Sequence, residues 1–406
     1  MTLYEGNLTM SLAVRLSTLL AFAILILPNA SNATEPPIRI GLDADMSSGA
    51  AKGGEAIRRG VALAIKEVND NGGVFGRPLE LIVRDHRGNP ARGVDNITEL
   101  AAMKDVVAVV GGIHTPVAMR ELPAIHKSNL IFLVPWAAGT PVVENGFEPN
   151  FVFRVSVRDQ FAGGFLVENA LKSGHKKLGL LFEKTGWGRS NEKAVKAALL
   201  PHGLAPAAIE WFGWGATDIS PQIKRLQKAG ADVIILVANP REGGIVVADI
   251  AAMPQDMRLP LLSHWGITGG DFFKANKNNL ARVDLSFLQT FSFFDPPIPD
   301  RANHLWTLYK TMFTDAVDPG DAFSPVGTAH AYDLVHILVA AIKKAGTIDR
   351  VLVQAALETL PFHSGVMRDY APPFTKNRHD ALDATNFRIG RYEANGQIRI
   401  VKTGTN

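Results

Sequence analysis

The feature that most constrains the fold is a regular alternation of short apolar strands with amphipathic helical segments. The first strand is predicted at residues 38–42, and the segment after it places Ile57, Val61, Ile65 and Val68 on one helical face. A strand, a helix and a further parallel strand form a βαβ unit, which buries its sheet under helices. The alternation therefore predicts an α/β fold built on parallel sheets.

This alternation occurs twice along the chain. Near-continuous apolar runs, typical of strands covered on both faces, lie at residues 79–83, 106–111, 130–134, 177–183, 231–237 and 259–263. Residues 151–155 separate the first set from the second. Two sets of similar size predict two doubly wound domains. A strand at 283–293, three helices and a polar tail follow, and we expect the first two domains to share them because they are too few for a third.

Composition agrees with a large folded protein of ordinary surface charge. A chain of 406 residues with 47% hydrophobic and 20% charged residues can bury the cores of two domains. The net charge of +3 is small, and no run of Lys and Arg interleaved with aromatic residues is found, so we expect no nucleic-acid partner. Cysteine is absent, which excludes disulfides, thiol catalysis, Cys-ligated zinc and an acylated cysteine.

The N-terminus has the pattern of a secretory signal. Residues 16–27 form an apolar stretch that is shorter than the roughly 20 residues of a membrane span. Small residues follow it, so we predict that residues 1–33 are a signal peptide cleaved after Ala33, with the true start at Met1 or Met10. An uncleaved membrane anchor is the alternative. We expect no later segment to be long and apolar enough to span a membrane.

Several predicted strand ends carry residues suited to binding a ligand. In parallel sheets, ligands bind in the crevice beyond the carboxyl ends of the strands. Gly allows close approach to the backbone, and Trp provides a flat apolar wall. The candidates are Ser47, Ser48, His114, Trp136, Trp187, His264 and Trp265. Each one alone can be a turn or core residue, and their recurrence at equivalent strand ends favours a common cleft.

No sequence motif indicates catalytic chemistry. The chain has no G-x-S-x-G elbow, Walker loop or H-E-x-x-H sequence, and no G-x-G-x-x-G opens its first helix. His114 and His264 are the candidates for metal ligation, but neither has a partner at ligand spacing or a carboxylate cluster beside it. We therefore expect no enzymatic activity, no cofactor and no metal.

Four segments and one dipeptide together resemble a known family. They are NDNGGVFGRPLELIVRDHRGNP, VVAVVGGIHTPVA, Trp187-Gly188, TDISPQIKRLQKAGADVIIL and AYDLVHILVAAIKKAG. Their content and order are similar to those of the leucine/isoleucine/valine-type periplasmic binding proteins of ABC importers, over residues 36–400. The resemblance implies a type I periplasmic binding fold, in which two doubly wound lobes are joined by three crossovers.

The resemblance also implies where the lobes divide. The crossovers are expected near residues 153–156, near 290–293 and after Pro361. Lobe 1 is then expected to hold residues 36–154 and about 292–362, and lobe 2 residues 155–291 and about 363–406.

Members of this family capture a small solute between lobes that close about a hinge and deliver it to a membrane permease. By this resemblance the chain is a monomeric periplasmic protein whose partners are a solute and a permease. The family's hydroxyl that receives the ligand carboxylate matches Thr115. Other pocket positions match Ala137, Ala138 and Thr140, which would hold the ligand ammonium, and Trp187 and Asn239. A ligand-sensing module that partners a membrane receptor or kinase is the alternative function.

Two departures from the family affect the expected solute. Residues 263–267, where amino-acid binders offer a carboxylate to the ligand ammonium, contain none. Trp136 replaces what is commonly a small residue. A pocket with Trp136, Trp187, Trp265, His114 and His264 suits a flat or aromatic carboxylate or amide, because rings stack there and imidazole donates hydrogen bonds. The expected solute is an amino acid, an amide or a carboxylate, and these departures favour an aromatic one.

Overall fold

Two sheets of mainly parallel strands organise the chain, and helices cover both. The computed structural model describes residues 35–401, so the predicted signal peptide and its cleavage site lie outside the described residues. The chain divides into two units, residues 1–36 and 37–406, and every contact described below lies within the second.

The first sheet has five parallel strands in the order β2-β1-β3-β4-β5. Its strands are β1 (Ile38–Ala44), β2 (Leu79–Asp85), β3 (Val106–Gly111), β4 (Ile131–Val134) and β5 (Val152–Arg154). The connecting helices are α2 (Ala51–Asp70), α3 (Pro90–Ala102), α4 (Thr115–Lys127) and α5 (Thr140–Val143). Strands β3 and β4 are buried at every position, as expected for strands covered on both faces.

The second sheet has seven strands in the order β14-β13-β10-β9-β8-β6-β7. Its parallel strands are β6 (Leu178–Glu183), β7 (Ala208–Phe212), β8 (Val233–Val237), β9 (Leu261–Ser263) and β10 (Leu285–Gln289). The antiparallel pair β13 (Arg388–Tyr392) and β14 (Ile398–Ile400) extends it at β10. Its helices are α6 (Asp159–Lys172), α7 (Gly186–Leu199), α8 (Ser220–Lys228), α9 (Pro240–Ala252) and α10 (Phe272–Leu280). The predicted α/β fold of two doubly wound sheets is confirmed.

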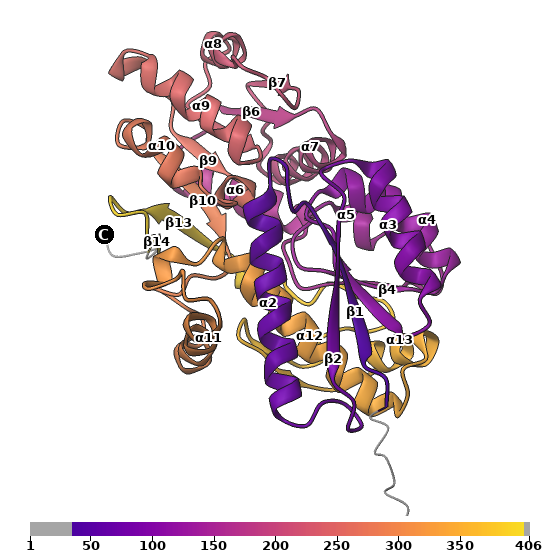
Figure 1. The fold of residues 1–406 in the computed structure, drawn as a ribbon. Helices are drawn as coiled ribbons and strands as arrows, with labels where there is room; N and C mark the ends of the chain where they lie inside the picture. The colour runs from indigo at the N-terminus through magenta and orange to yellow at the C-terminus, as the bar shows by residue number, and fades with distance from the viewer. Residues whose placement is uncertain (1–34, 402–406) are drawn as a thin grey trace, which may run out of the picture. The chain divides into compact units, whose positions relative to one another are not determined.

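The chain returns to the first sheet after β10. Figure 1 shows α12 and α13, drawn in orange, beside the indigo elements α2, β1 and β2 near the start of the described chain. The returning elements are α11 (Pro299–Met312), α12 (Pro325–Ala345), α13 (Arg350–Glu358) and the hairpin β11 (His363–Ser364) with β12 (Asp369–Tyr370). The chain thus passes between the sheets after β5, after β10 and between β12 and β13. The residue limits of the two lobes stay predictions.

Two parts of the second sheet were not predicted from the sequence. Strand β7 lies at the edge of the sheet, and only its last residue is fully buried, so its apolar pattern is weak. Strands β13 and β14 belong to the polar C-terminal segment, where the sequence analysis assigned no element. Strand β7 is an edge strand and β13 and β14 form the antiparallel extension at the other end of the sheet, and neither part has the continuous apolar run of a strand covered on two faces.

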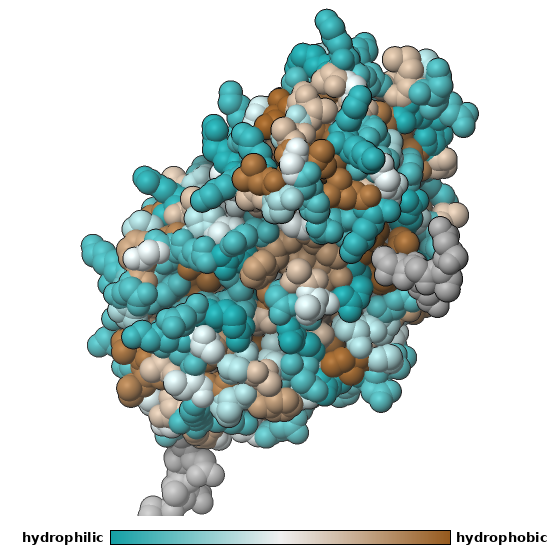
Figure 2. Space-filling view, turned by 180° about the vertical axis from the view of Figure 1, so that it is seen from behind, coloured by the Kyte–Doolittle hydropathy of each residue, from teal (hydrophilic) through white to brown (hydrophobic). Residues whose placement is uncertain are grey.

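By length and composition, helix α12 contradicts the expectation that no later segment is long and apolar enough to span a membrane. It alone among the helices in residues 35–401 is long and apolar enough by length and composition, but 83% of its apolar window is buried inside the protein. Its buried side packs against α2 and α13. Figure 2 shows a mainly hydrophilic face on which apolar residues form separate patches. The composition of α12 is therefore that of a core helix.

Candidate ligand-binding cleft

The carboxyl ends of strands from both sheets meet around a small enclosed space, here called the inner chamber. Its volume is about 10 Å³, roughly the space of one water-sized sphere. Its lining residues follow the strands of both sheets, and they are Ile113, His114, Thr115, Pro116, Trp136, Ala138, Glu183, Trp187, Asn239 and Trp265. Seven of the twelve predicted site residues are therefore brought together here.

Tryptophan side chains fill most of the space between the two sets of strand ends. The rings of Trp136 and Trp265 lie 5.5 Å apart, and the ring of Trp187 meets His264 edge-on at 5.0 Å. Gly266 leaves room for this arrangement, because a Cβ atom there would lie 2.4 Å from the Trp187 ring. Trp136, Trp187 and Trp265 are only 5%, 6% and 0% exposed. The aromatic side chains predicted for the cleft thus pack against one another.

A buried carboxylate that the sequence analysis did not single out lies at the end of β6. Glu183 is fully buried and accepts hydrogen bonds from Thr185 Oγ1 at 2.6 Å, Trp214 Nε1 at 3.1 Å and Asn239 Nδ2 at 2.8 Å. Burial raises its pKa. Residues 263–267 contain no carboxylate, as noted, and Glu183 brings one to this side of the cleft from the end of a different strand. In the sequence, Glu183 is visible only as a glutamate at the end of an otherwise apolar run.

On the side of the first sheet, Asp45 organises the loop after β1. It accepts hydrogen bonds from Ser48 N at 2.8 Å, Ser48 Oγ at 2.6 Å and Ala50 N at 3.0 Å, and its Oδ2 lies 3.2 Å from His114 Nε2. Burial acts to raise the pKa of Asp45, but the bonds from His114 and Ser48 outweigh it and hold that pKa well below its usual range. Asp45 therefore fixes the orientation of His114 at the border of the inner chamber.

A second, more spacious cavity adjoins the inner chamber, and we call it the outer chamber. Its volume is about 180 Å³. Residues from both sides of the cleft line it, and they are Asp45, Ser48, Gly49, Ala50, Arg87, Gly88, His114, Trp214, Gly215, Asn239, Arg241 and Glu242. His114 and Asn239 belong to the lining of both chambers. Of the predicted site residues, Ser48 faces only this chamber.

The remaining four predicted residues, Ser47, Ala137, Thr140 and His264, line neither chamber. Polar groups of Ser47, Ala137 and Thr140 form hydrogen bonds elsewhere in the structure. The Ser47 hydroxyl donates to Asp85, the Ala137 N–H to the carbonyl of Gly112, and the Thr140 N–H to Ser190 Oγ. His264 is fully buried behind Trp187, with its Nε2 3.3 Å from Asp159 Oδ1. Their assignment to ligand binding stays a prediction.

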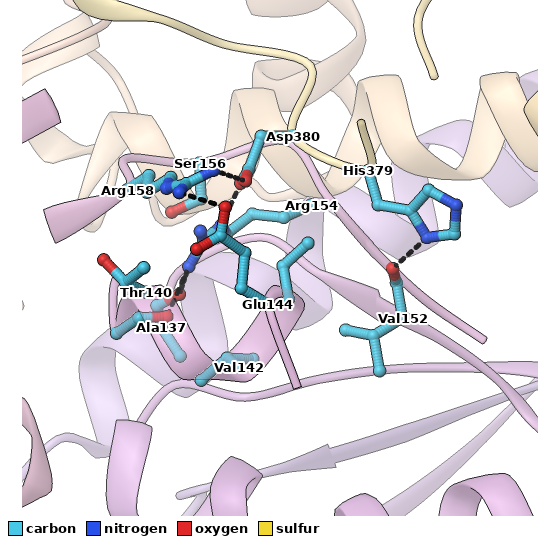
Figure 3. A network of polar contacts seen from close by, with 12 residues as sticks. Ala137, Thr140, Val142, Glu144, Val152, Arg154, Ser156, Arg158, His379 and Asp380 are labelled. Carbon is cyan, nitrogen blue, oxygen red and sulfur yellow. Dashed lines mark hydrogen bonds and ion pairs between the residues drawn. The ribbon is translucent and has the colours of Figure 1, made fainter. Parts of the chain in front are cut away.

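A buried ion pair holds the loop after β4 against the segments that pass between the sheets. Arg154 Nε donates to Asp380 Oδ1 at 2.5 Å, and both side chains are at most 3% exposed. Arg154 Nη1 also donates to the carbonyls of Ala137 and Gly139, at 3.0 and 2.9 Å. Figure 3 shows the guanidinium reaching from Asp380 to Ala137. The first and third passages between the sheets and one wall of the cleft therefore form a single network.

A further cavity lies away from these strand ends. It has a volume of about 540 Å³ and is bordered by α2, α11 and α12. Glu67 Oε1 lies 2.7 Å from His304 Nε2 there, and Oε2 lies 3.1 Å from His336 Nε2. Hydrogen bonding with His336, opposed by burial, lowers the pKa of Glu67 to about 2. Within residues 35–401, no three His, Asp or Glu side chains are grouped to hold a metal ion.

Two doubly wound α/β lobes, with facing strand ends and three connecting segments, define a two-lobed solute-binding protein of type I. The first lobe is the five-stranded sheet with its helices, and the second is the seven-stranded sheet with its helices. The chain belongs to the periplasmic binding protein family, whose description is "Periplasmic binding protein" and whose match covers residues 37–397. Members bind a solute rather than convert it, so this protein is not an enzyme.

Relatives and solved structures agree with this assignment. The Leu/Ile/Val-binding protein homolog 3 of Brucella melitensis is 25% identical over 337 residues, covering 83% of this chain and 86% of that protein. A branched-chain amino acid transporter substrate-binding protein of Streptococcus pneumoniae, crystallised with isoleucine, is 20% identical with a TM-score of 0.76, over 90% of this chain and 99% of that one. A solute-binding protein of an ABC transporter from R. palustris, crystallised with 4-hydroxybenzoate, is 21% identical with a TM-score of 0.76, over 90% and 95%.

Proposed function

We propose that this protein captures a small carboxylate-bearing solute in the cleft between its lobes and delivers it to the membrane permease of an ABC importer. It acts in the periplasm after removal of residues 1–33. The observation that carries the proposal is the convergence of strand ends from both lobes on adjoining chambers. A ligand that contacts both lobes favours the closed arrangement, which is the form that a permease can recognise.

An aromatic carboxylate is the solute class that the cleft supports best. Four tryptophans, Trp136, Trp187, Trp214 and Trp265, border the two chambers, and flat rings pack well against indole. Structures of similar fold were crystallised with isoleucine and with 4-hydroxybenzoate, so both solute classes occur on this fold. Glu183 keeps an amino acid as the second candidate, because a buried carboxylate attracts an ammonium group.

A thermal-shift screen of protein purified from the periplasm tests the proposal, because a ligand that binds only the folded state raises the melting temperature. The probes are benzoate, 4-hydroxybenzoate, benzamide, leucine and isoleucine. We expect the two aromatic acids to raise the melting temperature by several degrees and calorimetry to give one site. Stabilisation by leucine and isoleucine alone contradicts the aromatic assignment. If none of the carboxylates raises the melting temperature, the proposed function is contradicted. Sequencing of the purified protein is expected to begin at Thr34.

A further inference from the structure

The two chambers differ in the ligand that each can hold. The inner chamber, with a volume of about 10 Å³, is filled by the protein's own tryptophans. The outer chamber has a volume of about 180 Å³, and an apolar cavity of roughly 150 Å³ is known to hold a benzene ring. A solute with one six-membered ring therefore fits the outer chamber without displacement of Trp136, Trp187 or Trp265.

Two guanidinium groups border the outer chamber from opposite lobes. Arg87 follows β2 in the first lobe, and Arg241 lies in the first turn of α9 in the second lobe. Both side chains are 58% exposed, and their nearest carboxylates are at 3.4 Å from Arg87 and 4.0 Å from Arg241. These are loose ion pairs that contribute little energy. Both guanidiniums can therefore turn to a carboxylate, which Arg binds in a bidentate manner.

Backbone N–H groups near both arginines donate to side-chain carboxylates. Arg87 has a φ of +52°, a left-handed conformation that is uncommon for a residue with a side chain, and Asp85 Oδ1 accepts its N–H at 3.0 Å. Such an outlier is stored strain that the surrounding structure must support, and it is frequent at ligand sites. On the opposite side, Gly215 donates its N–H to Glu242 Oε1 at 3.0 Å, which engages that carboxylate.

An indole provides the flat wall of the chamber. Trp214 is 43% exposed, whereas the three tryptophans of the inner chamber are almost fully buried. Its Nε1 donates to Glu183 at 3.1 Å, and its ring lies 5.4 Å from the ring of His114. The indole is therefore fixed at one edge while the rest of its surface remains available to a ligand ring.

We propose that the solute is a monocyclic aromatic carboxylate bound in the outer chamber, with its ring against Trp214 and its carboxylate between Arg87 and Arg241. This inference rests on the proposed function and deepens it. Arg87 and Arg241 come from different lobes, so a carboxylate bound by both holds the lobes together. Removal of either arginine is expected to weaken solute binding and closure together.

Titration calorimetry with 4-hydroxybenzoate tests the inference on full-length mature protein. The variants are Arg87→Gln, Arg241→Gln and Trp214→Ala, and Arg92→Gln is the matched control because Arg92 is exposed and lines neither chamber. We expect each of the three cleft variants to bind at least tenfold more weakly and the control to bind within twofold of the wild type. Unchanged melting temperatures of the unliganded variants show that the loss is not a folding defect.

Two outcomes overturn the inference in distinguishable ways. If the wild type binds 4-hydroxybenzoate and both arginine variants bind it equally well, the carboxylate lies elsewhere, and a large loss in Thr115→Val then places it at the inner chamber. The proposed function survives that result. If the wild type binds none of the carboxylates in the thermal-shift screen, the proposed function fails and the inference fails with it.

Discussion

The carboxyl group of Glu183 is held by three donors at the border of the inner chamber, and burial raises its pKa. Its charge repels a solute carboxylate in the cleft, and protonation removes that repulsion. We therefore expect affinity for 4-hydroxybenzoate to increase as the pH falls through this raised pKa. Glu183→Gln is expected to bind the acid severalfold more tightly at pH 8 and to show a flatter pH dependence, measured by calorimetry between pH 5 and pH 8.

The control for this variant is Glu192→Gln on α7, a carboxylate that pairs with Lys196 at 2.9 Å outside both chambers. It is expected to leave both affinity and pH dependence unchanged. A Glu183→Gln protein that loses affinity for the acid would show that the carboxylate serves mainly to hold Trp214 and Asn239. If instead the wild type binds isoleucine and Glu183→Gln does not, Glu183 is assigned to binding a ligand ammonium group.

Asp43 and Glu121 form a buried acidic pair below the first sheet's strand ends. Asp43 Oδ1 accepts from Asn96 Nδ2 at 2.7 Å, and burial, only partly offset by hydrogen bonding with Glu121, raises the pKa of Asp43 to about 7. The folded state thus retains a proton that the unfolded chain releases near pH 4. More protons bound in the folded state means that stability falls as the pH rises from about 4 to about 7.

Substitution of Asp43 tests this linkage. Asp43→Asn replaces the titrating carboxyl with an amide that can donate to Glu121, so we expect the free energy of unfolding to fall less between pH 5 and pH 8 than in the wild type. Urea unfolding at several pH values measures it, with exposed Asp256→Asn as the control. A variant whose pH dependence equals that of the wild type would mean that the pair is ionised in both states.

At the scale of elements, the ion pair of Arg154 and Asp380 joins β5, the loop after β4 and the segment before β13. Removing Arg154 leaves the buried Asp380 with only the longer contact to Arg158 Nη1, at 3.5 Å, and loss of one partner of a buried pair costs about 3–5 kcal/mol. Arg154→Met is expected to lower the free energy of unfolding by about that amount. The double variant with Asp380→Asn is expected to recover part of it, because the stranded carboxylate is gone.

Urea unfolding of ligand-free protein measures both variants. The matched control is Arg225→Met, which removes an exposed arginine paired with Glu210 at 2.8 Å and is expected to cost less than about 1 kcal/mol. A loss in Arg154→Met no larger than in the control would show that the network of Figure 3 does not hold the connecting segments.

The sequence predicted elements according to how fully each is buried. Strands such as β3 and β4, covered on both faces, appear as continuous apolar runs and were found. The edge strand β7 and the antiparallel pair β13–β14 were missed, because one-sided or partial burial leaves no such run. In the cleft, aromatic and hydroxyl residues at strand ends were recognisable. Glu183 and Arg241 were not, since a single charged residue after a strand has no local pattern that separates it from a surface residue.

At the scale of the whole molecule, the two lobes contact each other closely across the cleft. The Thr140 N–H of the first lobe donates to Ser190 Oγ of the second at 3.1 Å, and Gly270 N donates to Ser324 Oγ at 3.0 Å. Trp136, Trp187 and His114 are at most 8% exposed. The inner chamber is therefore closed in this arrangement, and we expect a ring-bearing solute to enter the cleft faster when the lobes separate, as in hinge closure around ligands.

A reversible cross-link between the lobes tests that expectation. The chain contains no cysteine, so Thr140→Cys combined with Ser190→Cys introduces the only thiols, at positions already in contact. We expect the oxidised double variant to bind 4-hydroxybenzoate at least tenfold more slowly than the same protein after reduction. Stopped-flow tryptophan fluorescence measures both rates. The reduced double variant is the reference, so any contribution of Thr140 itself cancels. Equal rates before and after reduction would mean that the solute reaches the outer chamber through the closed cleft, and that closure serves recognition by the permease rather than entry.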